Sequence, residues 1–98
     1  MPNSVEQFDA IIIGAGQSGG PLSSALGNAG WKTAIIERQH VGGSCVNYGC
    51  TPSKTMIASA RVAHLVSRGD DYGVRTRPAE IDFGTVKRRK KEVVESFR

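Results

Sequence analysis

Two cysteines separated by four residues are the feature of this 98-residue chain whose chemistry is easiest to name. Cys45 and Cys50 lie in a segment that reads GGSCVNYGCTPSK and runs from Gly42 to Lys54. Asn47 and Gly49 suit the turn that a chain between two bridged cysteines must make. A disulfide that closes so small a loop stabilises a fold by only about 2 kcal/mol. We therefore expect a bond that opens and closes in a redox reaction, rather than a structural cross-link.

The two thiols differ in their expected surroundings. Cys50 stands directly before Thr51 at the expected start of a helix, and the N-terminus of a helix lowers the pKa of a thiol. Lys54, four residues further on, adds a positive charge. We therefore expect the thiolate at Cys50. Cys45, in the preceding loop, is expected to be the more accessible thiol and to attack an incoming disulfide or metal thiolate.

A glycine motif, Gly14-x-Gly16-x-x-Gly19, lies between an expected strand and an expected helix. In that context the glycines allow a tight turn and a close approach of the backbone to a pyrophosphate, and the helix N-terminus attracts the phosphates. Glu37 ends the next expected strand, where a carboxylate can bind both ribose hydroxyls and repels a 2′-phosphate. The motif therefore predicts FAD or NAD rather than NADP, and does not by itself separate the first two.

Apolar patterns place both motifs in an α/β fold. The first apolar run predicts a strand buried on both faces, as in a parallel sheet. Pro21 fits only the first turn of the helix that follows, and Asp82 is the expected N-cap of the last helix, which has no capping signal before Arg98. Strand, glycine turn, helix and strand make a βαβ unit. We expect strands over residues 8–13 and 32–37, helices over about 18–29 and 50–68 and from 83 onward, a loop over 38–49 and a short extended piece over 72–74.

The charge of the chain is uneven. Residues 1–74 carry five basic and five acidic side chains, whereas residues 75–98 carry eight basic and four acidic ones, so the net charge of +4 sits in the last quarter. Its centre is the run from Lys87 to Lys91, which has no aromatic residue within it. We expect a solvated helix face there and no nucleic-acid binding, although basic runs can bind nucleic acid.

Other functional classes are disfavoured by composition. No apolar run is long enough to cross a membrane, and the first ten residues contain no Lys or Arg and do not resemble a secretory signal. We therefore expect a cytoplasmic protein, in which a close cysteine pair is more often redox-active or metal-binding than structural. A structural zinc ion needs four ligands, and His40 and His64 lack zinc-finger spacing, so no metal site is expected.

Together the two motifs resemble the N-terminal part of the FAD-dependent pyridine nucleotide–disulfide oxidoreductases, over residues 8–98. This family includes dihydrolipoyl dehydrogenase, glutathione reductase and mercuric reductase. The Pro52-Ser53-Lys54 end is closer to the dihydrolipoyl and mercuric branches, and Pro21, Tyr48 and Thr51 are similar to mercuric-reductase-like members. The resemblance implies a partial Rossmann-like FAD-binding domain, with a βαβ unit, a redox-disulfide helix and a further helix.

The resemblance also implies a role for each motif residue. Cys45 would be the interchange thiol, Cys50 the thiol facing the flavin, and Lys54 would lie beside the flavin. Electrons would pass from NADH or NADPH through FAD to the Cys45–Cys50 disulfide, and on to a disulfide, dihydrolipoamide-type or Hg(II) substrate. Glu37 would bind the adenosine ribose. The remaining expected FAD-binding residues are Gly14, Ala15, Gly16, Gly19, Arg38, Gly42, Gly43 and Ser44, the last standing where the family usually has Thr.

Members of this family are several times longer than 98 residues. We therefore expect a polar leader over residues 1–7 and an incomplete FAD-binding domain over 8–98, without the nicotinamide domain or the dimerisation domain of the homodimeric parent. Such a chain alone is expected to be inactive. The alternative is a non-catalytic interaction module that self-associates without flavin, because a truncated domain leaves apolar surface exposed.

Overall fold

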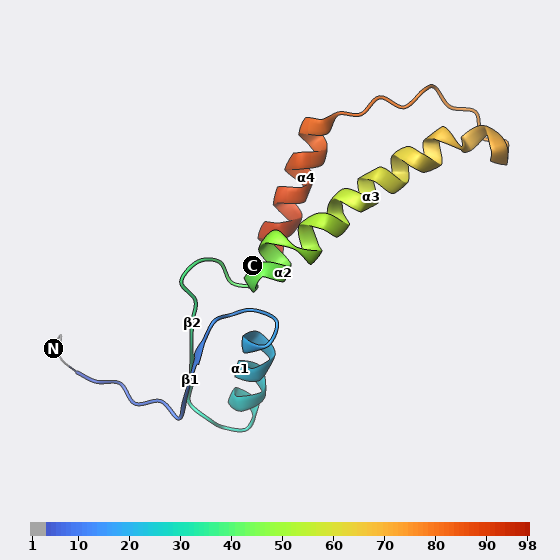
Figure 1. Ribbon diagram of the computed structural model, residues 1–98. Coiled ribbons are helices and arrows are strands. Elements are labelled where there is room, and N and C mark those ends of the chain that lie inside the picture. Colours follow the sequence, from blue (N-terminus) through green and yellow to red (C-terminus); the bar gives the residue numbers. More distant parts are fainter. Residues whose placement is uncertain (1–3) are drawn as a thin grey trace.

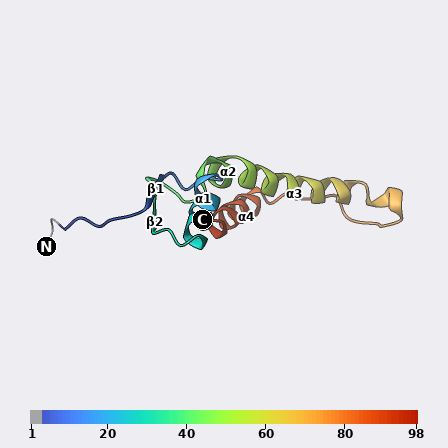
Figure 2. The ribbon, with the colours of Figure 1, turned by 90° about the horizontal axis from the view of Figure 1, so that it is seen from below.

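The computed structural model describes residues 4–98, so residues 1–3 of the expected polar leader lie outside the described part. The chain is elongated, with extents of 68 × 28 × 16 Å and a Cα radius of gyration of 21.1 Å. Figure 1 shows a strand-containing unit at one end and a group of helices at the other. Seen from below, in Figure 2, the helices continue away from the strands along the long direction of the molecule.

The predicted βαβ unit is confirmed. It consists of β1 (Ala10–Ile13), α1 (Gly19–Asn28) and β2 (Thr33–Ile36), and the two strands pair in parallel with Ile11 opposite Ala34. Pro21 lies in the first turn of α1, where its missing N–H costs no helical hydrogen bond. Both strands are shorter than expected.

The prediction that the first strand is buried on both faces is wrong. Ile11 is 60 % exposed and Ile13 is 87 % exposed, whereas the alternate residues Ala10 and Ile12 are half-buried. Figure 1 gives the reason, because α1 lies along one side of the two strands and nothing in the described chain covers the other. Parallel strands have long apolar runs because they are usually covered on both faces.

The segment expected to be a loop over residues 38–49 contains a short helix, α2 (Gly43–Tyr48). Gly42 precedes it with φ of 107°, a left-handed conformation that glycine adopts at little cost. The composition of the segment, rich in Gly, Ser and Asn, gave no helical signal. This helix carries Cys45, so the wrong prediction of a loop over residues 38–49 affects the surroundings of the cysteine pair.

Two long helices make the rest of the molecule. α3 (Cys50–Ser67) leads into the 3-10 turn η1 (Gly69–Tyr72), and residues 73–82 return to α4 (Phe83–Ser96), which lies antiparallel beside α3 (Figure 1). The expected extended piece over 72–74 is wrong, because Tyr72 ends η1 and Gly73 has a φ of 76°. α4 also ends within the chain, where the Phe97 N–H donates to the Val94 carbonyl over 3.1 Å.

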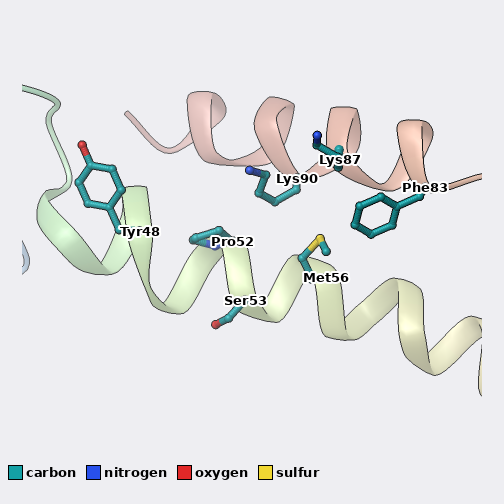
Figure 3. A pocket seen from close by; sticks show the side chains of 7 residues that line it. All are labelled: Tyr48, Pro52, Ser53, Met56, Phe83, Lys87 and Lys90. Atoms are coloured by element: carbon teal, nitrogen blue, oxygen red, sulfur yellow. The ribbon is translucent and has the colours of Figure 1, made fainter.

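The packing between α3 and α4 is light. Val94 is buried, Val86, Val93 and Met56 are half-buried, and Phe83 remains 56 % exposed. The Arg89 guanidinium reaches across to donate to the Thr55 carbonyl over 3.2 Å. A groove of about 410 Å³ remains between the two helices, as Figure 3 shows.

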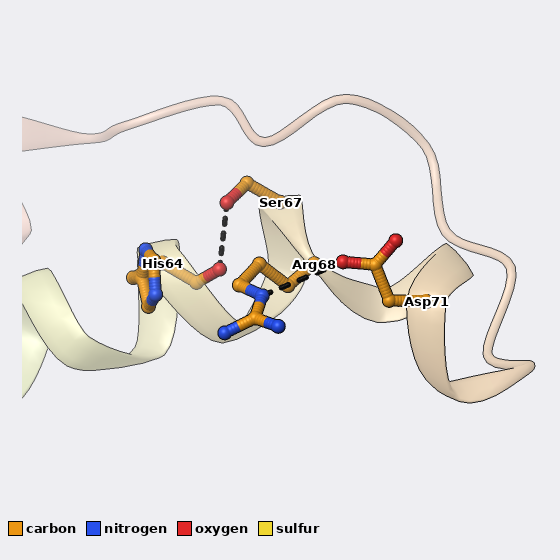
Figure 4. Close-up of polar contacts among 4 residues, drawn as sticks. All are labelled: His64, Ser67, Arg68 and Asp71. Atoms are coloured by element: carbon orange, nitrogen blue, oxygen red, sulfur yellow. Dashed lines mark hydrogen bonds and ion pairs between the residues drawn. The ribbon is translucent and has the colours of Figure 1, made fainter.

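The far end of α3 is closed by local polar contacts (Figure 4). The Ser67 hydroxyl donates to the His64 carbonyl over 2.6 Å, and Arg68 Nε lies 3.5 Å from Asp71 Oδ2. His64 is on the helix surface. These contacts satisfy the end of the helix far from both sequence motifs.

The predicted N-cap of α4, Asp82, is confirmed, and its contribution to stability can be measured. Asp82 Oδ1 accepts from the Thr85 N–H over 3.2 Å and Oδ2 accepts from the Thr85 hydroxyl over 2.6 Å. These bonds lower the pKa of Asp82 below its ordinary 3.8. A carboxyl with a lowered pKa stabilises the fold above that ordinary value and loses this contribution as the pH falls through the folded value.

We expect Asp82→Ala to lower the urea midpoint of unfolding at neutral pH by a few tenths of a molar unit, because it removes the cap. The difference from the unsubstituted chain should shrink in acid as Asp82 is protonated. Circular dichroism against urea at both pH values measures this. Glu80→Ala, at an exposed acidic residue just before the helix, is the control and should leave the midpoint unchanged.

Candidate functional site

The glycine motif forms the turn between β1 and α1. The Gly14 N–H donates to the Ile36 carbonyl over 2.7 Å, which extends the strand pairing into the turn. Gly14 has a φ of 104°, and open space lies beyond its Cα. A Cβ at Gly19 would overlap the Gly14 carbonyl oxygen, so only glycine allows α1 to begin this close to the strand. Gly14 therefore makes the tight turn and Gly19 the close packing of helix on strand that the motif predicts, whereas the approach of a pyrophosphate to Gly16 stays a prediction.

A second glycine segment, far away in the sequence, lies directly against the first. The Gly42 N–H donates to the Ala15 carbonyl over 2.7 Å. A Cβ on Gly43 would stand 2.8 Å from the Cα of Gly16, so the two backbones touch. Ala15, between them, is 5 % exposed. The expected phosphate-binding residues and the expected flavin-side residues therefore share one surface, which sequence spacing alone did not predict.

Glu37 is anchored on the same turn. Its Oε1 accepts from the Ala15 N–H over 3.1 Å and its Oε2 accepts from the Gln39 N–H over 3.0 Å. These bonds, that from Gln39 first, lower the pKa of Glu37, and the positive charge of the neighbouring Arg38 acts in the same direction. The carboxylate is thus ionised at neutral pH. Glu37 is not a simple surface residue at a strand end.

These residues fit a dinucleotide. Gly14 and Gly16 carry no side chain where a pyrophosphate would approach, and the buried Gly19 lets α1 begin beside them, so the N-terminus of this helix lies at the turn. The Glu37 carboxylate keeps lone pairs beyond the two hydrogen bonds that fix it. A carboxylate that is held by backbone N–H groups beside a glycine turn is a suitable acceptor for sugar hydroxyls.

The cysteines lie on two successive helices. Cys50 is the first residue of α3, as predicted, and it is exposed. Cys45 lies in α2 and is half-buried, so the prediction of a loop residue more accessible than Cys50 is wrong. Gly49 separates the helices, and a Cβ there would stand 3.3 Å from the Ser44 carbonyl oxygen. The chain therefore turns back at Gly49, which returns Cys50 toward Cys45.

The two thiols interact. The pKa of Cys45 is raised above its ordinary 9.0, chiefly by a side-chain hydrogen bond with Cys50 and then by desolvation and by the charge of Cys50. The Cys50 backbone and the positive charge of Lys54 act in the opposite direction and are weaker. In the reduced pair, Cys45 is therefore a thiol that holds its proton tightly. Lys54 is close enough to influence the pair, as its spacing predicted.

Asn47 is a site residue whose importance sequence reasoning missed. It is 8 % exposed, and its Nδ2 donates to the carbonyls of Gly43 over 2.8 Å and Val41 over 3.2 Å. Its Oδ1 accepts from Arg98 Nε over 2.7 Å. Asn47 thus fixes the glycine segment to α2 and to the end of the chain. Its place between the two cysteines is the signal that the sequence offers, and that signal predicts only a turn.

Two further features are absent from residues 4–98. No group of three or more His, Cys, Asp or Glu side chains lies close enough to hold a metal ion there. None of the described helices combines the length and the apolar character that a membrane crossing needs.

Comparisons with known proteins agree with this arrangement. The family model of the pyridine nucleotide-disulphide oxidoreductases matches residues 8–98. The dihydrolipoyl dehydrogenase of Chlamydia muridarum is 40 % identical over 93 residues, which are 95 % of this chain and 20 % of that protein. The mercuric reductase of Bacillus cereus is 39 % identical over 95 residues, which cover 93 % of this chain and 14 % of that protein.

A solved structure supports the same conclusion. The Cu(II) complex of a mutant of the HOCl-induced flavoprotein disulfide reductase RclA from Escherichia coli superposes with a TM-score of 0.73 at 32 % identity. The match covers 96 % of this chain and 18 % of that one, so the chain spans about a fifth of the length of such relatives. Fold, glycine turn and cysteine pair together show that the chain belongs to the pyridine nucleotide-disulphide oxidoreductase family and corresponds to its N-terminal, truncated Rossmann portion.

Proposed function

We propose that this chain is the FAD-binding, redox-disulfide part of a flavoprotein that passes electrons from NAD(P)H to a substrate through Cys45 and Cys50. One observation carries the proposal. Gly43, which touches Gly16 of the dinucleotide turn, is also the first residue of the helix that bears Cys45. The nucleotide-binding turn is therefore in direct backbone contact with the helix that carries Cys45. A protein that couples a bound cofactor to a disulfide requires such proximity.

The binding residues have separate tasks. FAD, when bound, supplies two-electron transfer between a nicotinamide and a disulfide. The glycine turn, with Gly14, Ala15, Gly16 and Gly19, receives the pyrophosphate, and the fixed Glu37 carboxylate binds the adenosine ribose. Gly42, Gly43 and Ser44 line the flavin side of the cofactor, and Lys54 lies beside the flavin. Arg38, next to Glu37, is a further cofactor-binding residue.

The thiols have complementary tasks. When the Cys45–Cys50 bond receives two electrons it opens into one thiolate and, with one proton, one thiol. The hydrogen bond with Cys50 raises the pKa of Cys45, so we place that proton on Cys45. Cys50 is the first residue of α3, and the N-terminus of a helix stabilises a thiolate. Cys45 then loses this proton to water and attacks a disulfide or Hg(II) thiolate substrate, which releases one substrate thiolate.

The whole protein has further proposed properties. We infer a cytoplasmic homodimer. We further propose that it acts on a disulfide, dihydrolipoamide-type or Hg(II) substrate, because the relatives include dihydrolipoyl dehydrogenase and mercuric reductase. We propose that the 98-residue chain itself binds the nucleotide but does not catalyse electron transfer from NAD(P)H to a substrate.

The alternative, a non-catalytic module that self-associates without flavin, is favoured by one observation. The face of β1 that α1 does not cover presents Ile11 and Ile13, both more than half exposed. A colourless, soluble oligomer that binds neither ADP nor FAD would support this alternative over the redox proposal.

Adenosine recognition is tested with ADP alone. We expect ADP to shift the amide resonances of residues 14–19 in NMR spectra, and Glu37→Gln to weaken ADP binding about five- to tenfold, because a charged acceptor is lost. The same variant should lessen discrimination against an ADP that carries a 2′-phosphate. Glu80→Gln is the matched control. Equal binding by all three proteins would contradict the role of Glu37.

The thiol interaction is tested by alkylation. We expect Cys50→Ala to lower the pKa of Cys45, because it removes the hydrogen bond that raises it. Alkylation of Cys45 by iodoacetamide, followed by mass spectrometry, should then reach its half-maximal rate at a lower pH than in the reduced unsubstituted chain. Ser44→Ala leaves both thiols in place and is the control. An unchanged pH profile in Cys50→Ala would refute the interaction.

The chain alone is expected to show no oxidation of NADH or NADPH above background when FAD and a disulfide or Hg(II) are supplied. It spans about a fifth of its relatives' length. Absorbance of the nicotinamide over time is the measurement. Sustained turnover would overturn the proposal that this part binds without catalysing.

A further inference from the structure

The groove between α3 and α4 reaches the first turn of α3, the helix that Cys50 begins, and neither cysteine lines it. It has a volume of about 410 Å³, near the lower end of the range for small-molecule pockets. Tyr48 and Pro52 each stand two residues from Cys50, and the Ser53 hydroxyl donates to the Cys50 carbonyl over 3.2 Å. The lining residues are Tyr48, Pro52, Ser53, Met56, Phe83, Lys87 and Lys90.

One wall of the groove carries a lysine where an apolar residue is expected. Lys90 lies four residues after Val86 and three before Val93, and these valines are half-buried on the face of α4 toward α3. Lys90 is half-buried as well, so the expectation of a fully solvated basic run is wrong at this residue. Figure 3 shows Lys90 projecting from α4 over Pro52.

The positive charge in the groove is not neutralised by the described chain. Lys87 and Lys90 are three residues apart on one helix, where like charges repel. The ion pairs of residues 4–98 join Lys32 to Glu6 and Arg68 to Asp71, and involve neither groove lysine. Lys90 also borders a second hollow, with Glu95, without forming an ion pair there within the same range.

The remaining walls are apolar. Met56 from α3 and Phe83 from α4 face each other across the groove in Figure 3. A thioether and an aromatic ring make favourable contacts with a flat aromatic body. The groove thus combines an apolar slot with two cations at its edge.

We propose that this groove binds an organic anion with an apolar, aromatic-sized body, and that it selects anionic disulfides as electron acceptors for the thiol pair. The inference rests on the proposed redox role of Cys45 and Cys50. The carboxylate pairs with Lys87 and Lys90, and the apolar body lies between Met56 and Phe83. The acceptor's disulfide is then within reach of the first turn of α3.

The reaction of a disulfide probe with the reduced pair is balanced. One cysteine thiolate attacks a probe sulfur, a mixed disulfide forms, and one probe thiolate leaves. The second cysteine, after losing its proton to water, attacks the mixed disulfide, which forms the Cys45–Cys50 bond and releases the second probe thiolate. Two electrons pass from the cysteines to the probe.

The test compares an anionic with a neutral aromatic disulfide, dithiobis(nitrobenzoate) and dithiodipyridine, on the reduced full chain. We expect Lys90→Gln and Lys87→Gln each to lower the rate constant for the anionic probe about three- to fivefold, which is the scale of one exposed charge pair. The rate constant for the neutral probe should stay unchanged. Lys90→Arg should retain the rate. Added salt should lower the anionic rate and leave the neutral one unchanged.

Lys91→Gln removes the same charge from the next position, which does not line the groove, and is the matched control. An equal loss in Lys91→Gln, or a parallel loss for both probes, would overturn the groove as the cause. The neutral probe keeps the two proposals apart, because failure to form the Cys45–Cys50 bond with it counts against the redox role itself. Lys87→Gln, at an exposed position, serves if Lys90→Gln does not fold.

Discussion

The contact between two glycine backbones is the constraint on which the rest of this structure depends. Gly16 and Gly43 touch with no room for a Cβ on Gly43, and the Gly42 N–H donates to the carbonyl of Ala15 beside them. This contact joins the strand unit to the helices, and Asn47 reinforces it by bonding the Gly43 carbonyl. A side chain at Gly43 would separate the nucleotide turn from the helix that carries Cys45.

The sequence predicted those parts whose signals are local. The glycine turn, the βαβ order, the start of α3 at Cys50 and the Asp82 cap each depend on residues a few positions apart, and all are present. α2 was missed because a helix of six residues, rich in small polar side chains, has no apolar period. The exposure of Cys45 was also predicted wrongly, since it depends on that helix.

Long-range features were beyond the reach of pattern analysis. Asn47 accepts a hydrogen bond from Arg98, 51 residues away, and the half-buried position of Lys90 depends on how α4 lies on α3. The apolar run of β1 correctly predicted a parallel strand but not its uncovered face. The sequence of such a strand is apolar because helices cover both faces of the sheet in a complete domain, whereas the described chain covers only one face.

The elongated shape has a consequence for how this chain behaves in solution. A compact domain of about 100 residues has a radius of gyration of about 13 Å, and a value of 21.1 Å corresponds to a compact protein of roughly 380 residues. On a gel-filtration column a monomer of this shape would elute early, at the position of a much heavier globular protein. Its state of association is therefore to be measured by light scattering, which reports mass independently of shape.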